Sequence, residues 1–193
     1  MPRKFKIWVE RDEYGELPEL DEEDIERLKK KAINYCVFKI SDSDQSRKSL
    51  EDKMRRKGAP QEVIDHALDY MEQEDFINDR RLAGNYVSAK KDDKRGDRYI
   101  ANYLRQKGLD AAMVAEVLEE QSDPDKDYEN ALEFGRSAWR SLSRWPEQRE
   151  KSQRLTRKLI TRGYDFDIAF RVFDELWAEH LAELEEETIT EED

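Results

Sequence analysis

Few residues of this chain have the types and spacing that enzymatic chemistry requires. Histidine occurs only at His66 and His180, and cysteine only at Cys36, so the sequence offers no His/Cys cluster for zinc. The many carboxylates are scattered, and the glycine patterns of phosphate loops, dinucleotide-binding turns and nucleophile elbows do not occur. Cys36 lies on the apolar stripe of a helical segment, where we expect a buried core thiol. The sequence therefore predicts no catalytic residue, no metal, no cofactor and no enzymatic activity.

Basic side chains are the residues whose grouping does indicate a chemistry, namely the binding of a long polyanionic or acidic partner. The groups are Arg47, Lys48, Lys53 and Arg55 to Lys57; Lys90, Lys91, Lys94, Arg95, Arg98, Arg105 and Lys107; and Arg149, Lys151, Arg154, Arg157, Lys158 and Arg162. Each group alone could be a solvated face that nearby carboxylates balance. A basic group recurs at the same place in each of three repeated segments, and this recurrence favours a discontinuous basic stripe.

The net charge of -12 is compatible with such a stripe. Residues 181–193 contain seven carboxylates and no basic residue, so most of the acidity belongs to the C-terminal tail. A flexible segment of that length reaches only about 20 Å, and its field decays over about 8 Å at physiological salt. The rest of the chain is close to neutral and has strong local patches.

The elements that carry these side chains repeat three times. Each copy is an apolar-periodic helix, basic residues, one glycine and a second apolar-periodic helix, and the copies superpose when Gly58, Gly108 and Gly163 are aligned. Apolar residues recur four and eight positions before each glycine and five, nine and ten positions after it, which places them on one stripe of each helix. We expect each glycine to be a structural joint in the left-handed conformation, which costs other residues about 1–2 kcal/mol.

A further helical segment before each pair completes a unit of three helices. The predicted fold is all-α, with three tandem three-helix repeats in an elongated array, a short N-terminal arm and an acidic C-terminal tail. The ranges are 1–20 for the arm, 21–72, 73–122 and 125–181 for the repeats, and 182–193 for the tail. We expect the tail to fray into disorder after the last helix.

Local signals add detail to this organisation. The arm is either a short strand or an unpaired segment that docks through Phe5, Ile7 and Trp8. The glycines Gly84 and Gly135 lie inside helical patterns and indicate close helix packing. The candidates for helix N-caps between the first two helices are Ser43, Asp44 and Ser46.

Composition restricts the class of protein further. Charged residues make up 42% of the chain against a typical quarter, which favours long solvated helices around a thin core. No apolar run approaches the roughly 20 residues of a membrane span, and the first ten residues lack the apolar stretch of a signal peptide. We expect a cytoplasmic, monomeric protein that does not contact a membrane.

The middle of the chain resembles the RecX family, bacterial regulators of the RecA recombinase. The strings EDFINDRRLAGNYV, KRGDRYIANYLRQKG and VAEVLEE carry the resemblance, which spans about residues 25–180. The matching residues are Glu74, Phe76, Ile77, Asn78, Asp79, Ala83, Gly96, Arg98, Ile100, Leu104, Lys107 and Gly108. Two residues depart from the family pattern, since Asp75 stands where glycine is usual and Leu82 where an aromatic residue is usual.

The resemblance implies a protein that lies in the helical groove of the RecA filament on single-stranded DNA. There it would restrain filament growth, ATP hydrolysis, strand exchange and repressor self-cleavage by steric and electrostatic contact, with weak, non-specific contact to the DNA backbone. The residues that we predict to make contact are Arg55, Arg56, Lys57, Lys90, Lys91, Lys94, Arg95, Arg98, Arg105 and Lys107. Asp79 is interpreted as structural, because Asn78 or Asp79 can cap a helix; a direct partner contact is the alternative.

Two other classes of function stay open. A direct nucleic-acid-binding repeat protein would use its turn-linked helices as helix-turn-helix modules, although the helices after the three glycines are acidic or apolar and would be repelled from a major groove. A non-enzymatic helical scaffold would use an apolar concave face instead of the charges.

Overall fold

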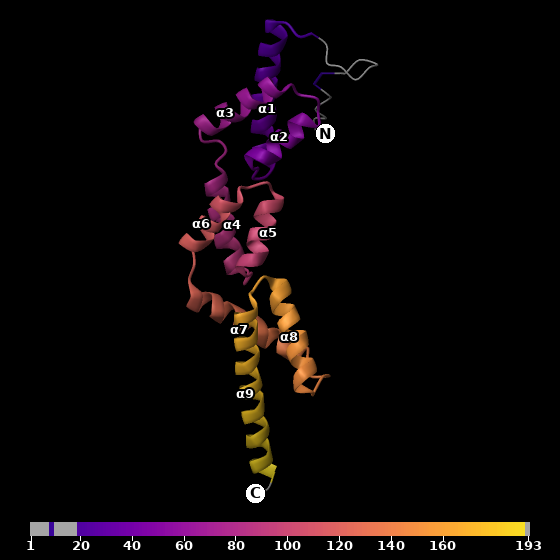
Figure 1. Cartoon of the computed structure of the whole chain (residues 1–193), viewed down its shortest axis with the longest axis vertical. Coiled ribbons are helices and arrows are strands. Elements are labelled where there is room, and N and C mark those ends of the chain that lie inside the picture. Colours follow the sequence, from indigo (N-terminus) through magenta and orange to yellow (C-terminus); the bar gives the residue numbers. More distant parts are fainter. Residues whose placement is uncertain (1–7, 10–18, 192–193) are drawn as a thin grey trace. The chain divides into compact units, whose positions relative to one another are not determined.

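The computed structural model describes residues 8–9 and 19–191, with side chains up to residue 186. These residues form nine α-helices and no strand (Figure 1), which confirms the predicted all-α class. The helices are α1 (Glu22–Asp42), α2 (Arg47–Arg55), α3 (Gln61–Gln73), α4 (Asp79–Asp92), α5 (Asp97–Gln106), α6 (Ala111–Glu120), α7 (Pro124–Arg140), α8 (Gln148–Arg162) and α9 (Phe166–Glu191).

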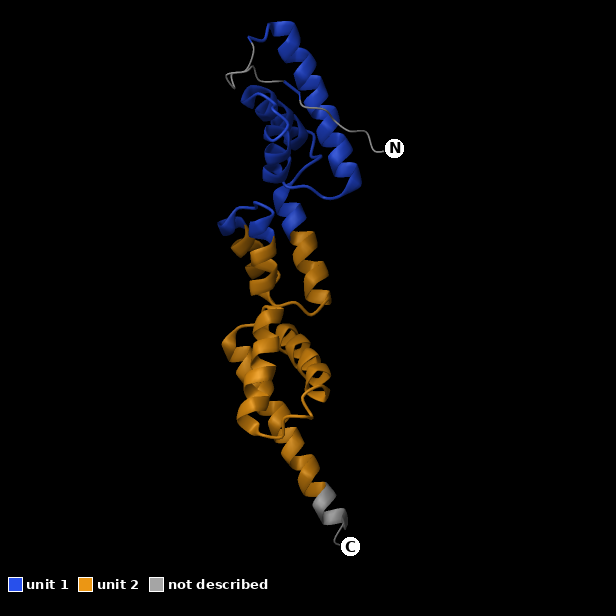
Figure 2. Cartoon of the chain, turned by 90° about the vertical axis from the view of Figure 1, so that its right-hand side faces the viewer, with its two compact units in different colours: residues 1–83, 104–113 blue, residues 84–103, 114–193 orange. Residues whose placement is uncertain are grey.

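The chain divides into two compact units (Figure 2). Unit 1 comprises residues 1–83 and 104–113, and unit 2 comprises residues 84–103 and 114–193. The division runs through α4, α5 and α6, so the second predicted repeat contributes to both units. In unit 1, α1 packs mainly on α3, and in unit 2, α9 packs on α7 and α8.

The core of unit 1 follows the predicted apolar spacing. Leu50 and Met54 lie one helical turn apart on α2 and are fully buried, as is Tyr35 on α1. Cys36 is also buried, and this burial raises the pKa of its thiol to about 12. The predicted core thiol is therefore confirmed.

The three aligned glycines end α2, α5 and α8 as predicted. Their φ angles are 79° for Gly58, 81° for Gly108 and 106° for Gly163, in the left-handed region that side chains disfavour. The residue after each glycine donates its backbone N–H to the carbonyl five positions back, which is the Schellman arrangement. These bonds run from Ala59 to Met54, from Leu109 to Leu104 and from Tyr164 to Leu159, at 3.1–3.2 Å.

The carbonyl just before each glycine accepts a hydrogen bond from an earlier part of the chain. The three bonds are Trp8 N to Lys57 O at 2.8 Å, Ser46 Oγ to Lys107 O at 2.5 Å and Gly96 N to Arg162 O at 3.1 Å. In every repeat, the carbonyl before the glycine therefore accepts its hydrogen bond from a residue that does not belong to the two helices joined by that glycine. For the first repeat, the N-terminal arm fills this role.

The turn before α5 approaches the turn after α8 at backbone distance. A Cβ atom on Gly96 would lie 2.4 Å from the carbonyl carbon and oxygen of Gly163, and a Cβ on Gly163 would lie 2.6 Å from the carbonyl oxygen of Gly96. Arg98 N also donates to Gly163 O at 3.1 Å, and the side chain of Arg162 donates to Lys94 O at 3.0 Å. The carbonyl end of α8 thus caps the amino end of α5.

Two of the local predictions hold. A Cβ on Gly135 would lie 2.7 Å from Val172 Cγ1, so close packing of α7 on α9 is confirmed. Ser46 is the N-cap of α2, where its Oγ accepts from Ser49 N at 3.1 Å, whereas Ser43 is the C-cap of α1. Asp44 caps neither helix.

The prediction for Gly84 is wrong. A Cβ at Gly84 would have only the amide nitrogen of Gln121 near it, at 3.3 Å, because the Gln121 side chain reaches over to donate to Gly84 O. No helix packs closely there among the described residues.

The ends of the chain differ in how they match the predictions. Trp8 is buried and meets Tyr35 edge-on at 5.4 Å, so docking of the arm through Trp8 is confirmed, while Phe5 and Ile7 lie outside the described residues. The predicted fraying of the tail is wrong as far as Glu191, because α9 continues to that residue. Glutamate and leucine are good helix formers, and the tail extends a helix that is already anchored on unit 2.

Candidate polyanion-binding surface

Most of the predicted contact residues of the first repeat already have partners within the chain. Arg55 pairs with Glu51 and donates to Gln61 at 2.9 Å. Lys57 Nζ lies 6.0 Å from the centre of the Tyr35 ring. Arg56 is exposed and has no carboxylate within ion-pairing distance among the described residues.

The lysines of α4 and of the turn after it are engaged as well. Lys90 pairs with Asp93 at 2.5 Å, and Lys94 pairs with Glu133. Lys91 is 7% exposed, and its Nζ lies 3.0 and 3.1 Å from the two carboxylate oxygens of Asp127. This ion pair ties α4 to α7 inside unit 2. The placement of Lys91 gives it a structural role and does not support it as a partner contact.

Two predicted arginines near the start of α5 remain accessible: Arg95 is half-buried in the turn before the helix, and Arg98 is exposed in its first turn. The Arg95 guanidinium lies 4.2 Å from the centre of the Tyr99 ring, and Arg98 lies 6.0 Å from that of Phe166, which is 53% exposed. Arg95 and Arg98 have no ion-pair partner among the described residues. Arg105 and Lys107, by contrast, both interact with other parts of the chain.

Asp79 has a structural position, as interpreted from the sequence, but it does not cap its own helix. Asn78 caps α4, since its Oδ1 accepts from Arg81 N at 2.9 Å. Asp79 Oδ1 accepts from Arg47 N at 3.0 Å, at the start of α2. Burial raises the pKa of the Asp79 carboxyl, although the Arg47 backbone N–H opposes the shift. Asp79 therefore ties the amino ends of α4 and α2 together.

Asp75 shows why glycine is usual at its position. Its φ angle is 54°, in the left-handed region, which aspartate tolerates better than most residues. Its carboxylate accepts from Asn78 Nδ2 at 3.3 Å and pairs with Arg81. These bonds hold the turn before α4 in place without a glycine.

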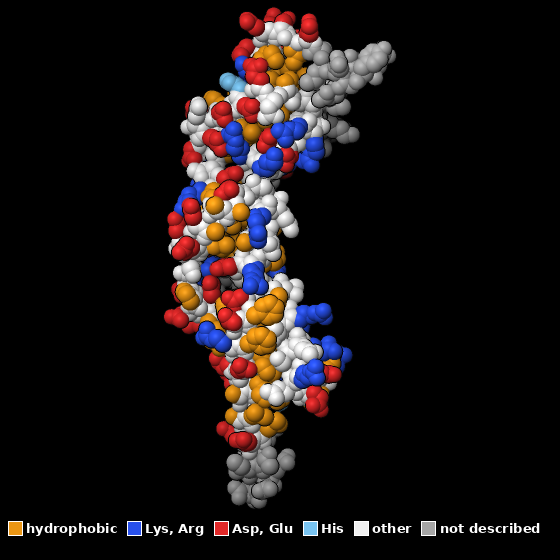
Figure 3. Space-filling view, in the orientation of Figure 1, with side chains coloured by type: hydrophobic (Ala, Val, Ile, Leu, Met, Phe, Trp, Pro, Cys, Tyr) orange, Lys and Arg blue, Asp and Glu red, His pale blue; other side chains and the backbone are white. Residues whose placement is uncertain are grey.

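The basic residues of α8 form a different kind of surface. Leu155 and Leu159 lie one turn apart and are buried, and Lys151 continues this stripe with its Nζ 4.5 Å from the centre of the Trp139 ring. Burial lowers the pKa of Lys151. Arg154, Arg157 and Lys158 lie outside this stripe and are exposed, where Lys and Arg side chains gather over α8 (Figure 3).

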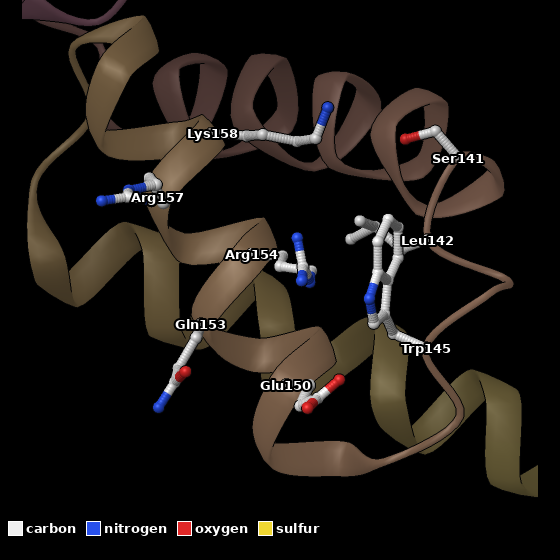
Figure 4. Close-up of a pocket in the computed structure, with 8 residues that line it drawn as sticks. All are labelled: Ser141, Leu142, Trp145, Glu150, Gln153, Arg154, Arg157 and Lys158. Atoms are coloured by element: carbon white, nitrogen blue, oxygen red, sulfur yellow. The ribbon is translucent and has the colours of Figure 1, made fainter.

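A cleft of about 810 Å³ lies between these residues and the loop that joins α7 to α8. The Arg154 guanidinium stacks at 3.9 Å from the centre of the Trp145 ring. Arg154 and Lys158 point toward Trp145 and Ser141, whereas Arg157 points outward at the rim (Figure 4). Glu150 is the carboxylate of this lining.

A second cleft, of about 360 Å³, adjoins the first and shares Arg157 and Lys158 with it. Its other residues include Arg95 and Phe134, and the Arg162 guanidinium lies 4.8 Å from the centre of the Phe134 ring. We call the surface of both clefts the α8 trough. It combines five cations, one carboxylate and an aromatic ring near each end.

The sequence identified the basic group on α8, but the predicted contact residues left it out. Arg154, Arg157 and Lys158 make no ion pair among the described residues, unlike Lys90, Lys91 and Lys94. The signal that could have found them is the spacing of Lys151, Leu155 and Leu159, which turns the intervening cations outward.

The described residues offer little else for chemistry. They contain no group of three or more His, Cys, Asp and Glu side chains that could hold a metal ion. None of the described helices is long and apolar enough to cross a membrane. A helical-repeat protein with charged and aromatic residues gathered on its surface is the class that this fold and site define.

Comparison with known proteins gives the family. The models of the first, second and third three-helix domains of RecX match residues 32–71, 78–118 and 125–173. The chain belongs to the RecX family, as the resemblance predicted, and each predicted repeat contains one of these domains.

Relatives and solved structures agree with this assignment. A regulatory protein RecX from Clostridioides difficile is 28% identical over 160 residues, which cover 82% of this chain and 72% of the relative. Another from Clostridium botulinum is 30% identical over 157 residues, 77% of this chain and 73% of the relative. The crystal structure of RecX from Lactobacillus salivarius has a TM-score of 0.71 at 24% identity, covering 78% of this chain and 97% of that one, and shows a similar fold.

Proposed function

We propose that this protein binds the filament that RecA forms on single-stranded DNA and inhibits its growth, ATPase activity and strand exchange, in DNA repair and the SOS response. The observation that supports this most is the match of all three domains to a regulatory family. In this proposal the protein acts in the cytoplasm as a monomer, and by occupying surface rather than by a catalytic step.

Three tandem domains suit a partner that repeats along a filament. Each domain supplies its own exposed or half-buried cations without an ion-pair partner among the described residues, with Arg56 in the first, Arg95 and Arg98 in the second, and Arg154, Arg157 and Lys158 in the third. Several weak contacts within one chain give an affinity that no single contact reaches. We therefore propose these six residues as the principal contacts, in place of the paired lysines Lys90, Lys91 and Lys94.

Binding measured against salt tests the proposal. The protein is titrated with naked single-stranded DNA and with the RecA filament on the same DNA, in low and physiological salt. Filament binding that persists at physiological salt, together with weak and steeply salt-dependent binding to naked DNA, is expected. Equal affinities for the two targets under all conditions would contradict regulation through the filament.

Charge reversal identifies the surface. The variant R56E/R95E/R98E should lose most of the filament affinity while keeping the helicity of the wild type, because these side chains have no carboxylate partner to lose. The control R27E/K30E/K126E changes three exposed cations by the same total charge; Arg27 and Lys126 also lose pairs with Asp24 and Asp92, and exposed pairs of this kind contribute less than about 1 kcal/mol to stability. If both variants bind the filament equally, net charge and not this surface governs binding.

The α8 trough favours a second candidate, a protein that binds nucleic acid directly. Its cations and aromatic rings would serve that function without RecA. In the same titration, this candidate predicts that RecA adds nothing to the affinity for single-stranded DNA.

A further inference from the structure

We propose that the α8 trough is a binding site for single-stranded DNA, in which Arg154, Arg157 and Lys158 contact phosphates and the Arg154 guanidinium, held against the Trp145 ring, offers its free face to a base. This inference deepens the proposed function, because it names the filament component that the third domain touches. It can be tested separately, since the trough would bind DNA in the absence of RecA.

The first argument is charge that is left unpaired within the chain. Elsewhere in unit 2 the structure neutralises its exposed or half-buried lysines locally, as with Lys90 and Asp93 or Lys94 and Glu133. In the trough, Arg154, Arg157 and Lys158 have no carboxylate within ion-pairing distance among the described residues. Three neighbouring cations repel one another, and an anion bound among them would replace this repulsion by attraction.

The second argument is the placement of aromatic rings among these cations. Trp145 is half-buried against the core of unit 2 and lines the larger cleft, where the flat guanidinium of Arg154 covers it at 3.9 Å. Phe134 and Arg162 form a similar pair in the smaller cleft. An arginine held flat against an aromatic ring offers a planar face for a nucleobase and N–H donors for a phosphate.

The third argument is the length of the trough. The trough residues Glu150 and Arg162 lie twelve positions apart on α8, which corresponds to about 18 Å at 1.5 Å per residue. This length accommodates about three nucleotides of an extended strand, since adjacent phosphates lie roughly 6–7 Å apart in an extended strand.

An acidic protein segment is the other class of partner that such charges could attract. It would use the cations but would gain little from a tryptophan that stacks on an arginine. Single-stranded nucleic acid uses both features, because every base has a π-face and every nucleotide a phosphate. The combination therefore favours the nucleic acid.

The test uses the full-length chain and a fluorescein-labelled thymidine oligonucleotide, with affinity followed by anisotropy between 50 and 200 mM salt, a range of about fourfold. The variant R154E/R157E/K158E should bind at least tenfold more weakly, and its log Kd against log salt should be shallower by about 2, from three lost phosphate contacts at about 0.7 each. R27E/K30E/K126E, with the same change in charge, should keep the wild-type slope. A slope that falls equally in both variants would overturn the proposal.

Substitutions of Trp145 test the contribution of stacking separately from that of charge. W145A should weaken DNA binding roughly tenfold without changing the salt slope, and W145F should keep the affinity because a ring remains for stacking. DNA should quench the tryptophan fluorescence of the wild type, and this quenching should be absent in W145F, which lacks Trp145. Circular dichroism of each variant shows whether it is folded. Unchanged affinity in folded W145A would refute base stacking and with it the site.

Polyglutamate of matched charge distinguishes the two classes of partner. Wild-type protein should bind it more weakly than the oligonucleotide, and W145A should bind it as the wild type does. If polyglutamate binds as tightly as DNA, the trough is a site for an acidic protein segment and the proposal fails. Inhibition of RecA by a protein whose trough does not bind DNA would leave the regulatory function standing and would refute only this site.

Discussion

The junction between Gly96 and Gly163 gives the sharpest test of how the repeats are joined, through the substitution Gly163→Ala. The φ angle of Gly163 is 106°, and a side chain in the left-handed region costs about 1–2 kcal/mol. The new Cβ would also lie 2.6 Å from Gly96 O and from Tyr99 N, both of them backbone atoms that no rotamer change can move. Overpacking of this kind costs about 1–3 kcal/mol.

Together these terms lower the free energy of unfolding by about 2–5 kcal/mol. For a chain of this size the midpoint of thermal unfolding falls by about 2–4 °C per kcal/mol, so a decrease of roughly 4–20 °C is expected. The assay is thermal unfolding followed by circular dichroism, with urea unfolding as a second measure.

Two further substitutions separate the causes. Gly96→Ala adds only the close contact, since its Cβ would lie 2.4 Å from Gly163 C and O at a φ that is not left-handed, and we expect a loss of about 1–3 kcal/mol. Gly84→Ala is the control, because only the flexible Gln121 amide is near and alanine favours a helix over glycine by up to about 1 kcal/mol. A Gly163→Ala protein as stable as the wild type, or less affected than Gly84→Ala, would refute the described junction.

Two other substitutions test structural ionisable groups. Burial raises the pKa of Asp79, so the carboxyl contributes to stability below its pKa in the unfolded chain, about 4, and this contribution is lost as pH rises through its pKa in the folded protein. Asp79→Asn keeps an acceptor for Arg47 N and does not ionise, so its stability relative to the wild type should rise from pH 3 to pH 7 in urea unfolding. A difference in stability that stays constant over this pH range would contradict the assigned burial. Lys91→Ala leaves Asp127 without its closest cation and should cost about 3 kcal/mol, whereas Lys126→Ala, at an exposed pair, should cost less than about 1 kcal/mol; equal losses would show that Lys91 is not a buried structural ion.

Local chemistry made much of the fold predictable. The three glycines follow from a rule that acts within a few residues, because the left-handed turn after a helix excludes most side chains wherever it occurs. The apolar spacing around them placed Leu50, Leu104 and Leu159 in buried positions, and all three are buried. The tail was less predictable, since helix propensity and anchoring favour continuation while its clustered acidic residues at a helix C-terminus oppose it.

The contact residues were harder to predict, because pairing of charges depends on the tertiary fold. Lys91 and Lys94 look like members of a basic patch in the sequence, yet their partners Asp127 and Glu133 lie 36 and 39 residues away. Nothing near them in the chain indicates these partners. The helical spacing of Lys151 with Leu155 and Leu159 would have predicted that Lys151 lies on the buried stripe of α8 and that the exposed cations of this helix lie outside that stripe.

ATP hydrolysis by RecA on single-stranded DNA, recorded while the purified protein is added during filament growth, tests the proposed function most directly. We predict that the wild-type protein lowers the rate at substoichiometric amounts, that R56E/R95E/R98E does so far less, and that R27E/K30E/K126E acts as the wild type does. An unchanged rate of hydrolysis at every ratio of wild-type protein to RecA would contradict the proposal that this chain inhibits the RecA filament.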